Sequence, residues 1–278
     1  MEPKRGDEIV SFWAPAPVLI AGPCVLEDHS TNVEIASCLQ KLSSKHNVQV
    51  AFKASFDKAN RSNAGAPRGP GIERGLEMLE RVKNELAIPV LTDIHEVWQV
   101  NEAAAVVDAL QIPAFLCRQT DLLEAAGSSD RPVNIKKGQW MPPEAMAGAV
   151  TKVRNAGGVD VALTERGSFF GYGDLVVDMR NFRRLREATL APVLFDATHS
   201  VQRPGLGPGG SSGGNREFCA DLIKGAAAAG ADGFYLETHP SPDKAQSDSS
   251  TMLPLDRLDE LIERTLTIWN AAAGAGKQ

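Results

Sequence analysis

Eight short apolar runs recur along this chain of 278 residues, and longer segments of mixed polarity separate them. The runs are rich in Val, Ile, Leu and Phe and show little alternation with polar residues, which is typical of strands buried on both faces of a parallel sheet. They span residues 18–22, 48–54, 89–94, 109–114, 132–137, 159–166, 191–197 and 233–239. Parallel strands need a crossover connection between them, usually a helix.

Helical patterns lie between most of the runs. The segment IERGLEMLERVKNEL, residues 72–86, carries apolar residues at helical spacing and ends shortly before Pro89. Residues 142–158 open with Pro and close with Gly, the asymmetry expected of helix ends, and residues 216–233 and 255–274 behave alike. Eight β/α units in about 250 residues match a TIM barrel, whose active site lies at the C-terminal ends of the strands. We therefore predict an α/β fold, a (β/α)8 TIM barrel, with a doubly wound open sheet as the alternative.

No linker or compositional repeat divides the chain, so residues 1–278 are predicted to form a single barrel domain. Residues 1–17 are expected to be an N-terminal extension, and residues 167–182 a longer insertion after the sixth strand. The Gly-rich stretch 203–218 contains a G-x-G-x-x-G match at 205–210. Because this loop is long and no strand ends directly at its first glycine, we expect a mobile loop over an active site rather than a dinucleotide site.

Charge and composition exclude several classes of protein. The formal net charge is −6 with acidic and basic residues interspersed, which gives no electrostatic footprint for nucleic acid or an anionic membrane surface. No apolar run approaches the roughly 20 residues that span a bilayer. The N-terminus mixes acidic residues with Lys4 and Arg5 and is interrupted by prolines, so no signal peptide is expected. The four cysteines are widely spaced without a C-x-x-C pair, which favours free thiols and a cytoplasmic location.

Charged and polar side chains concentrate where the apolar runs stop, which is where a barrel builds its active site. One group is cationic and consists of Lys53, Lys58, Arg61, Arg118, Lys136 and Arg166. Such a set suits the binding of phosphate or carboxylate groups. Each cation taken alone is as well explained as a solvated loop residue, but six of them at strand ends of an acidic protein favour an anion site.

A second group consists of Cys24, His199 and Glu237 at the strand ends and of Asp248 beyond the eighth strand. Thiolate, imidazole and carboxylates together form a donor set for a transition metal, because Mg²⁺ does not select sulfur. The four residues match no local metal motif. Packing of the cysteine and a structural hydrogen bond of the histidine therefore stay open as alternatives.

The sequence around these residues resembles the 3-deoxy-D-manno-octulosonate 8-phosphate synthases. The resemblance runs almost end to end, from LIAGPCVLED at 19–28 to SDSSTMLPL at 247–255, and its most specific piece is FKASFDKANRSN at 52–63. LTDIHE, QIPAFLCRQTDLL, VNIKKGQ, FDATHSVQRPG and LETHPSPDKAQSD support it. Related aldolases that use erythrose 4-phosphate share the barrel but typically carry Lys-Pro-Arg where this chain has KANR at 58–61.

The resemblance implies condensation of phosphoenolpyruvate with D-arabinose 5-phosphate and water, with release of phosphate. In Gram-negative bacteria this supplies an inner-core sugar of lipopolysaccharide. The resemblance also implies a metal-dependent enzyme, because the metal-independent branch carries asparagine at the place of Cys24, and the SDSS around Asp248 is more similar to the metal-dependent branch. The implied ligands of one divalent metal are Cys24, His199, Glu237 and Asp248, and Zn²⁺, Fe²⁺, Mn²⁺ and Co²⁺ all suit this donor set.

The same resemblance implies a set of substrate-binding residues: Lys53, Lys58, Asn60, Arg61, Ser62, Asp93, Gln111, Arg118, Lys136 and Arg166. Lys136 and Arg166 would hold the phosphate of phosphoenolpyruvate, with Lys58 near its carboxylate and the reacting centre. Asn60, Arg61 and Ser62 match the motif that receives arabinose 5-phosphate. Arg118 is similar to an arginine that reaches a substrate phosphate across a subunit boundary, and the resemblance implies a homotetramer.

The implied mechanism begins when C3 of phosphoenolpyruvate attacks the sugar aldehyde and positive charge develops at C2. Water adds at C2, and the resulting hemiketal phosphate collapses by C–O cleavage. The implied catalytic residues are Lys58, Asn60, His199 and Asp248. Lysines and arginines would orient multiply charged reactants that otherwise repel each other, and a metal would polarise the aldehyde or activate water, a choice that the sequence leaves open.

Other functions stay open at this stage. A Schiff-base aldolase would need a desolvated lysine with a lowered pKa, and both Lys53 and Lys136 end barrel strands, although polar groups surround them. A phosphoenolpyruvate-dependent aldolase that acts on another aldose phosphate is a second alternative. A non-catalytic barrel that binds phosphosugars would need the cations but would have no use for the cysteine, histidine and carboxylates.

Overall fold

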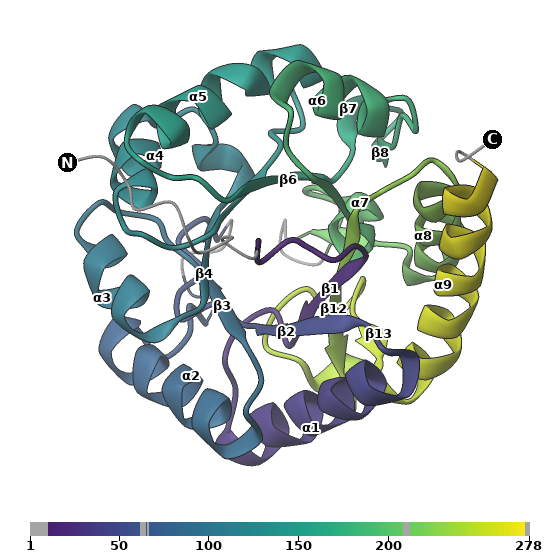
Figure 1. Ribbon diagram of the computed structural model, residues 1–278. Coiled ribbons are helices and arrows are strands. Elements are labelled where there is room, and N and C mark those ends of the chain that lie inside the picture. Colours follow the sequence, from purple (N-terminus) through teal and green to yellow (C-terminus); the bar gives the residue numbers. More distant parts are fainter. Residues whose placement is uncertain (1–10, 62–64, 66, 208–211, 276–278) are drawn as a thin grey trace.

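The computed structural model of this chain describes residues 11–61, 65, 67–207 and 212–275. Within these residues, eight parallel strands follow one another around a closed barrel, and the last strand pairs with the first (Figure 1). The strands are β1 (Val18–Gly22), β2 (Gln49–Lys53), β3 (Val90–Asp93), β4 (Ala109–Ile112), β5 (Val133–Lys136), β6 (Val161–Glu165), β9 (Val193–Asp196) and β12 (Gly233–His239). The predicted (β/α)8 TIM barrel is confirmed, and the doubly wound open sheet is wrong.

A helix follows each barrel strand and covers the outside of the barrel. These helices are α1 (His29–His46), α2 (Ile72–Leu86), α3 (Gln99–Val106), α4 (Thr120–Gly127), α5 (Ala147–Asn155), α6 (Asn181–Thr189), α8 (Cys219–Ala228) and α9 (Leu258–Ala275). The bounds of α2 are those predicted. The patterns predicted to start at 142, 216 and 255 begin instead with a 3₁₀ turn before α5, α8 and α9, a common feature of helix N-termini. None of the helices in the described part of the chain is long and apolar enough to cross a membrane.

Besides β1, which follows Pro17, three further barrel strands start just after a proline, at positions 89, 132 and 192. Proline has no backbone N–H and cannot donate to a ladder. Its carbonyl oxygen can still accept, and each of these three accepts a bond of 2.8–2.9 Å from a residue of the neighbouring strand. The prolines therefore set where these strands begin without leaving the ladder incomplete.

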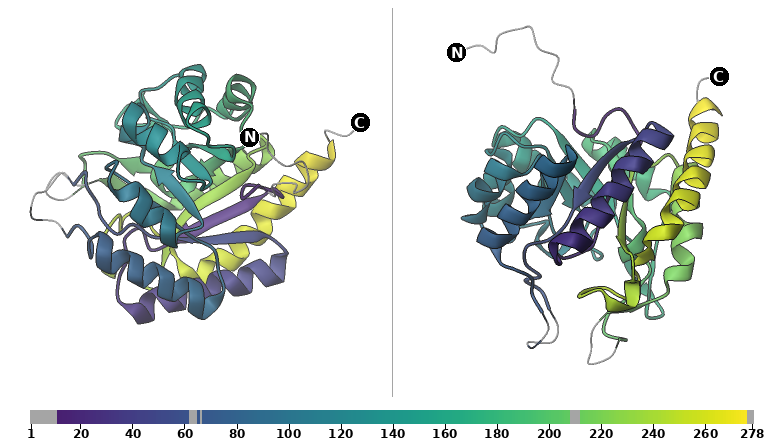
Figure 2. Two further views of the ribbon diagram at one scale, coloured as in Figure 1. Left: turned by 60° about the vertical axis from the view of Figure 1, so that its left-hand side comes forward. Right: turned by 90° about the horizontal axis from the view of Figure 1, so that it is seen from below.

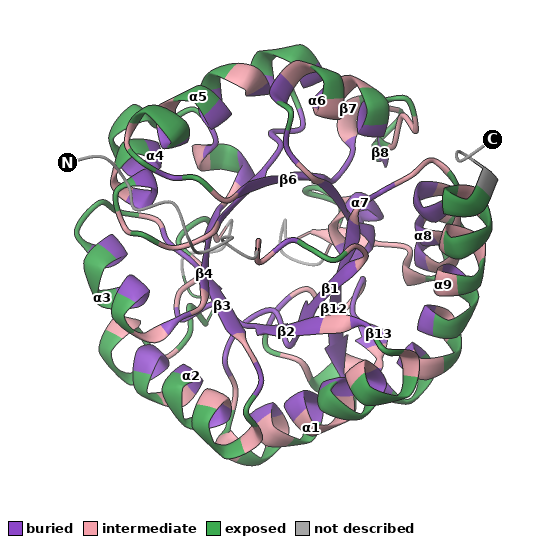
Figure 3. Cartoon of the chain, viewed as in Figure 1, coloured by how far each residue is buried: buried purple, intermediate pink, exposed green. Residues whose placement is uncertain are grey.

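Two apolar cores lie on either side of the barrel wall. The larger core lies between the outward side chains of the strands and the helices, and Figure 3 shows these buried surfaces facing inward from an exposed outer ring. The smaller core fills the inside of the barrel and consists of Trp13, Val18, Ile20, Leu91, Ala109, Ala162, Leu194 and Tyr235. Successive residues of a strand point to opposite faces, so β1, β3, β4, β6, β9 and β12 each contribute to both cores.

The described part of the predicted N-terminal extension, residues 11–17, lies across the N-terminal end of the barrel (Figure 1). Trp13 is 1% exposed and packs with the inner core. The carboxylate of Asp160 accepts bonds of 2.6 Å from both the hydroxyl of Ser11 and the backbone N–H of Phe12. This segment therefore closes one end of the barrel. Residues 1–10 lie outside the described residues.

The remaining short strands lie in the connections that follow the barrel strands. The predicted insertion forms the hairpin of β7 (Ser168–Gly171) and β8 (Asp174–Val176). The Gly-rich segment is bracketed by β10 (Gln202–Arg203) and β11 (Gly213–Gly214), which pair antiparallel, and residues 208–211 between them lie outside the described residues. Figure 2 shows that the loops after β2 and β9 lie at one end of the barrel and that the C-terminal end of α9 lies at the other. The strand-end side chains therefore collect at this end.

Candidate active site

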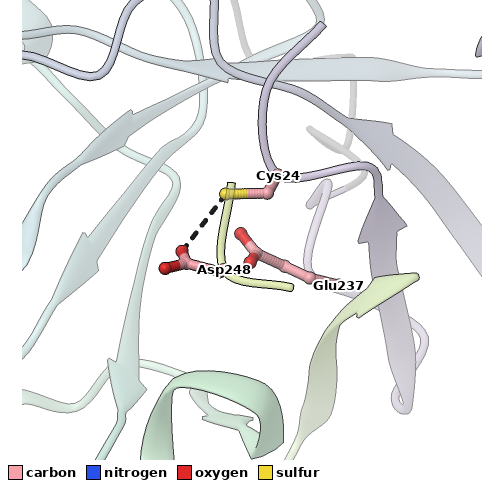
Figure 4. A group of neighbouring side chains, drawn as sticks. All are labelled: Cys24, Glu237 and Asp248. Atoms are coloured by element: carbon pink, nitrogen blue, oxygen red, sulfur yellow. Dashed lines mark hydrogen bonds between the residues drawn. The ribbon is translucent and has the colours of Figure 1, made fainter. Parts of the chain in front are cut away.

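Four donors of the predicted metal set come together at the C-terminal end of the barrel. Cys24 follows β1, His199 lies in the short helix α7 (Ala197–Ser200) after β9, and Glu237 lies in β12. Asp248 lies in the loop before β13 (Leu253–Pro254), which extends the sheet beside β12. Figure 4 shows Cys24, Glu237 and Asp248 converging, and each offers a ligand atom within 4.8 Å of the others.

The backbone around Cys24 explains the sequence Gly-Pro-Cys. A Cβ atom at Gly22 would lie 1.9 Å from the carbonyl oxygen of Lys53, so only glycine lets β1 approach β2 this closely. Cys24 then adopts φ +65°, and Asp248 adopts φ +49°, both in the left-handed region that non-glycine residues rarely occupy. Such conformations are retained mainly where function needs them. Two of the four predicted metal ligands are held in this way.

Several distances between the donor atoms suit a shared metal ion, although only Cys24, Glu237 and Asp248 offer ligand atoms that all lie within 4.8 Å of one another. Sγ of Cys24 lies 3.3 Å from Oδ2 of Asp248. Nε2 of His199 lies 3.5 Å from Oε1 of Glu237 and 3.6 Å from Oδ2 of Asp248. Donors bound to one tetrahedral metal at about 2.0–2.3 Å are themselves about 3.3–3.8 Å apart. In addition, Oε2 of Glu237 is buried and has no hydrogen-bond partner within the described residues, which a native carboxylate rarely tolerates.

The ionisation of these groups also suits metal binding. Burial raises the pKa of the Cys24 thiol well above its usual value, and the charge of Glu237 raises it further. Burial opposes ionisation of Asp248, but the hydrogen bond and the charge of His199 leave the pKa of this carboxyl well below its usual range. A metal would have to displace the thiol proton, so its binding would release a proton and depend on pH.

Asp196 and Tyr235 each contact one of the predicted metal ligands. Oδ2 of Asp196 lies 2.7 Å from Nδ1 of His199, which leaves Nε2 of the ring directed toward the other donors. Carboxylates commonly orient metal-bound histidines in this way. The hydroxyl of Tyr235 donates a 3.1 Å bond to Oε1 of Glu237. Tyr235 was not among the predicted site residues, although its position two residues before Glu237 in a strand puts both side chains on one face.

The predicted cations Lys53, Lys136 and Arg166 are buried beside the metal donors. Nζ of Lys136 lies 2.6 Å from Oδ2 of Asp196 and 3.4 Å from Nδ1 of His199. Burial and the neighbouring charges of Lys53 and Arg166 lower the pKa of Lys136 to about 8, although Asp196 opposes this shift. Lys53 and Lys136 are each paired with a carboxylate, and Arg166 beside them adds a positive charge that favours the binding of an anion.

Arg166 has unused hydrogen-bonding capacity. Its guanidinium donates a 3.3 Å bond to Oε1 of Gln202, and its Nε atom is buried without a partner among the described residues. Burial lowers the pKa of this arginine, which nonetheless stays charged at neutral pH. A buried guanidinium with a free donor is well suited to a phosphate oxygen.

Lys53 and Asp93 form a paired group in the floor of the site. Their charged atoms lie 3.1 Å apart, and Nζ of Lys53 also bonds to the hydroxyl of Ser55 at 2.7 Å. Nε2 of His95 lies 3.2 Å from the other oxygen of Asp93. Burial disfavours the charge on Asp93, but Lys53 and His95 hold its pKa well below the usual range. Asp93 therefore stays ionised at neutral pH.

Lys58 is half-buried and lies close to the metal donors. Burial lowers the pKa of a lysine, but Cys24 in its thiolate form and the carboxylates of Asp93 and Glu237 raise the pKa of Lys58 above its usual value. This lysine therefore remains a cation at any physiological pH. It lies in the loop after β2, which also carries Asn60 and Arg61.

Of the other predicted substrate-binding residues, Asn60 and Arg61 lie in the loop after β2, and Gln111 lies in β4. Asn60 is exposed, whereas the guanidinium of Arg61 bonds to the carbonyls of Pro67 at 3.0 Å and Gln246 at 3.4 Å. Ser62 lies outside the described residues. Gln111 is buried in β4, and its Oε1 accepts a 3.1 Å bond from Asn134.

Arg118 is not brought together with the other cations in this chain. It is exposed and lines a separate hollow of about 480 Å³ with Trp140, Pro142 and Lys152. Phe115 and Trp140 stack beside this hollow with ring centres 5.8 Å apart, although they are 50% and 41% exposed. The structure thus places an aromatic and cationic surface outside the barrel mouth.

Two further strand-end charges have structural roles. Nζ of Lys137 is fully buried, bonds to the carbonyl of Gly167 at 3.1 Å and lies 3.6 Å from Oε1 of Glu165. Glu165 in turn accepts bonds of 2.6 Å from Gly167 and 3.0 Å from Asn181. These contacts fix the turn after β6, so not every charge at a strand end faces the site.

Comparison with known proteins places this site in a family. Residues 14–270 match the profile of the DAHP synthetase I family. The chain is 52% identical over 260 residues to a 2-dehydro-3-deoxyphosphooctonate aldolase of Syntrophotalea carbinolica, which covers 93% of both chains. It is 49% identical over 267 residues to the protein of that name from Desulfotalea psychrophila, with 96% of this chain and 94% of the relative covered. The Bradyrhizobium diazoefficiens relative of the same name is 50% identical over 258 residues, with 92% and 91% covered.

Proposed function

This chain belongs to the DAHP synthetase I family, and on that premise we propose that it condenses phosphoenolpyruvate with D-arabinose 5-phosphate and water to give 3-deoxy-D-manno-octulosonate 8-phosphate and inorganic phosphate. The product supplies a sugar of lipopolysaccharide. One observation carries the proposal at the level of the site: donors of a metal-binding type lie beside the buried cations Lys136 and Arg166 at one end of the barrel.

The residues that would hold one divalent transition metal are Cys24, His199, Glu237 and Asp248. Bound there, the metal would supply a Lewis acid for the aldehyde oxygen or for water. Asp196 fixes the ring of His199 by its 2.7 Å contact with Nδ1 and keeps Nε2 available. The mixed sulfur, nitrogen and oxygen set suits Zn²⁺, Fe²⁺, Mn²⁺ or Co²⁺, and excludes Mg²⁺ as the preferred ion.

Lys136 and Arg166 bind the phosphate of phosphoenolpyruvate. The free Nε of Arg166 and the ammonium of Lys136 offer charged donors in a buried place, where hydrogen bonds to an anion are stronger than in water. Lys53 adds positive charge from the floor of the site. Lys58, which stays cationic, neutralises the carboxylate of phosphoenolpyruvate next to the reacting carbon. These cations hold the two anionic reactants in contact while C3 attacks the aldehyde.

Asn60, Arg61 and Ser62 receive D-arabinose 5-phosphate, with Arg61 on its phosphate. The guanidinium of Arg61 donates hydrogen bonds to the backbone carbonyls of Pro67 and Gln246. The contact with Gln246 joins the loop after β2 to the loop that carries Asp248. Sugar binding and the metal donors are therefore linked through one segment of chain. Asp93 and Gln111 complete the polar lining below.

We infer that copies of this chain associate as a homotetramer in the cytoplasm. The stacked pair Phe115 and Trp140 gives an exposed aromatic surface, and Arg118 beside it would reach the active site of a neighbouring copy. The four cysteines are free thiols, which suits a reducing compartment.

The test is phosphate release from phosphoenolpyruvate and D-arabinose 5-phosphate after exhaustive chelation, and again after addition of Mn²⁺ or Zn²⁺. We expect activity to disappear with chelation and to return with metal. Undiminished activity without metal would keep the condensation but remove the role of Cys24. Faster turnover with erythrose 4-phosphate would show that another aldose phosphate is the substrate.

One observation favours a second candidate, a Schiff-base aldolase. Lys136 is buried and its pKa is lowered to about 8, which is what a nucleophilic lysine needs. Its Nζ atom is, however, held 2.6 Å from the Asp196 carboxylate, which favours the protonated form. Borohydride treatment in the presence of phosphoenolpyruvate and the sugar separates the two: a covalent adduct on Lys136 would support the Schiff base, and its absence the condensation.

A further inference from the structure

Tyr235 lies between the metal donors and the phosphate-binding cations. It is fully buried in β12, two residues before Glu237, so both side chains point into the barrel. The chain has two tyrosines, and the other, Tyr172, is fully exposed at the turn of the β7–β8 hairpin. A phenol in this buried place is therefore a specific feature of the site.

The hydroxyl of Tyr235 makes the shortest contact of the Glu237 carboxylate. It donates to Oε1 at 3.1 Å. The next donor, Nε2 of His199, lies 3.5 Å from the same oxygen, too far for a strong bond. Oε2 of Glu237 has no partner among the described residues. The tyrosine therefore restricts the rotation of the carboxylate, whose other oxygen has no donor within the part of the chain that the structure describes.

The ring of Tyr235 has a separate contact on its face. Nζ of Lys136 lies 3.4 Å from the ring centre, and Nζ of Lys53 lies 5.9 Å from it. A cation over an aromatic face is attracted by the negative potential of the ring. The hydroxyl thus contacts Glu237, one of the predicted metal ligands, and the ring contacts Lys136, one of the proposed phosphate-binding cations.

We propose that Tyr235 is a positioning residue that holds the Glu237 carboxylate in the orientation required by the metal, and that its ring independently holds the ammonium of Lys136 for the phosphate. This inference rests on the metal site proposed above. A buried hydrogen bond to a ligating carboxylate lowers the freedom of that ligand before the ion arrives, and loss of such a partner typically weakens metal binding by about 10–100-fold.

The two roles can be separated by substitution. Tyr235→Phe removes the hydroxyl and keeps the aromatic face, so we expect the Kd for metal to rise by about 10–100-fold and the Kd for phosphoenolpyruvate to stay within about 2-fold. Tyr235→Leu removes the face as well, so the Kd for phosphoenolpyruvate should then also rise. Tyr172→Phe is the matched control, because the same atom is removed at a fully exposed position.

The experiment is a Co²⁺ titration of the full-length chelated protein, followed by the visible absorption of the bound ion and by competition with a chelator of known affinity. Thiolate-to-Co²⁺ absorption in the wild type and in Tyr172→Phe, with weaker binding in Tyr235→Phe, is the expected result. Equal Co²⁺ affinity in Tyr235→Phe and the wild type would overturn the role of the hydroxyl while leaving the metal site intact. Absence of Co²⁺ binding by the wild type would overturn the proposed metal site, and the role of Tyr235 with it.

A second measurement does not depend on the folding of the Tyr235 variants. In Tyr172→Phe, Tyr235 is the sole tyrosine, so the ultraviolet resonance Raman doublet of tyrosine reports the hydrogen bonding of this one hydroxyl. With Co²⁺ bound, we expect the two bands of the doublet to have the intensity ratio of a tyrosine hydroxyl that donates a strong hydrogen bond to a carboxylate. A ratio typical of a free hydroxyl or an acceptor in the metal-loaded protein would contradict the proposal.

Discussion

Sγ of Cys24 lies 3.3 Å from Oδ2 of Asp248, although 224 positions separate the two residues in the sequence. Both are held with positive φ at the C-terminal end of the barrel, one after the first barrel strand and one after the last. Because β1 and β12 are neighbours in the closed sheet, the two loops face each other. Closure of the barrel thus creates the contact.

Replacement of Cys24 by alanine tests this contact. We expect Cys24→Ala to bind Co²⁺ or Zn²⁺ at least about 100-fold more weakly and to lose the thiolate-to-Co²⁺ absorption, since a thiolate is the strongest donor of the set. Cys38→Ala, at a half-buried position on α1, is the control and should bind metal as the wild type does. Wild-type metal content in Cys24→Ala, measured by elemental analysis, would remove the thiol from the site.

Arg166→Lys should weaken the binding of phosphoenolpyruvate. Lysine keeps the charge but loses the planar guanidinium and its free Nε donor. We expect the KM for phosphoenolpyruvate to rise by about 10–100-fold, with a smaller change in the KM for arabinose 5-phosphate. Arg154→Lys, whose guanidinium bonds to the carbonyls of Thr189 and Leu190 away from the site, should leave both constants unchanged.

Lys137→Met should destabilise the fold. The variant would leave Glu165 buried without its counter-charge, which typically costs about 3–5 kcal/mol of unfolding free energy. Burial already raises the pKa of Glu165 even with Lys137 present. Urea unfolding measures the loss. The double variant Lys137→Met, Glu165→Gln removes both charges and should recover most of the stability. A double variant as unstable as Lys137→Met would show that the unpaired charge of Glu165 is not the cause.

Asp28 makes stability depend on pH at the start of α1. Its carboxylate accepts hydrogen bonds from the hydroxyl of Ser30 and from the backbone N–H of Thr31, and these hold its pKa well below the usual value. A carboxyl with a depressed folded-state pKa contributes stability above its unfolded pKa of about 3.9, and this contribution is lost as pH falls through the folded-state value.

We therefore expect Asp28→Ala to cost about 1 kcal/mol at neutral pH. The difference from the wild type should shrink when urea unfolding is repeated below a pH of about 4, where the wild-type carboxylate loses its advantage. Asp28→Asn keeps a capping oxygen that does not titrate. It should be close to the wild type at neutral pH, and a difference between Asp28→Ala and the wild type that stays constant with pH would contradict the assignment.

Trp140→Glu tests the exposed aromatic surface. Trp140 is 41% exposed and stacks on Phe115, so a charge there should leave the barrel folded but prevent burial of this face between copies. Sedimentation velocity should show a homotetramer for the wild type and smaller species for the variant. Leu190→Glu, at a surface position that is 82% exposed, is the control and should remain a tetramer. A monomeric wild type would exclude association through this face.

The sequence by itself determined where the strands of the barrel lie along the chain. Continuous apolar runs such as 18–22 and 233–239 identify buried parallel strands, and the structure gives both of these strands the predicted bounds. It also determined which residue types stand at the strand ends. The point where an apolar run gives way to polar residues can be read directly from the sequence. The packing of Trp13 in the inner core of the barrel was not predicted. No local pattern predicts which distant surface a single aromatic side chain will cover.

Only the tertiary structure decided which strand-end groups meet. The strand-end pair Lys136 and Lys137 illustrates this, because neighbouring side chains of a strand point to opposite faces: Lys136 contacts His199 in the barrel, whereas Lys137 is buried against Glu165 and the turn after β6. The same applies to Tyr235, whose value to the site depends on the distances from its hydroxyl to Glu237 and from its ring to Lys136. The sequence determines on which face of a strand a side chain lies. Closure of the barrel sets the distances between side chains of different strands, and the chemistry of the site depends on those distances.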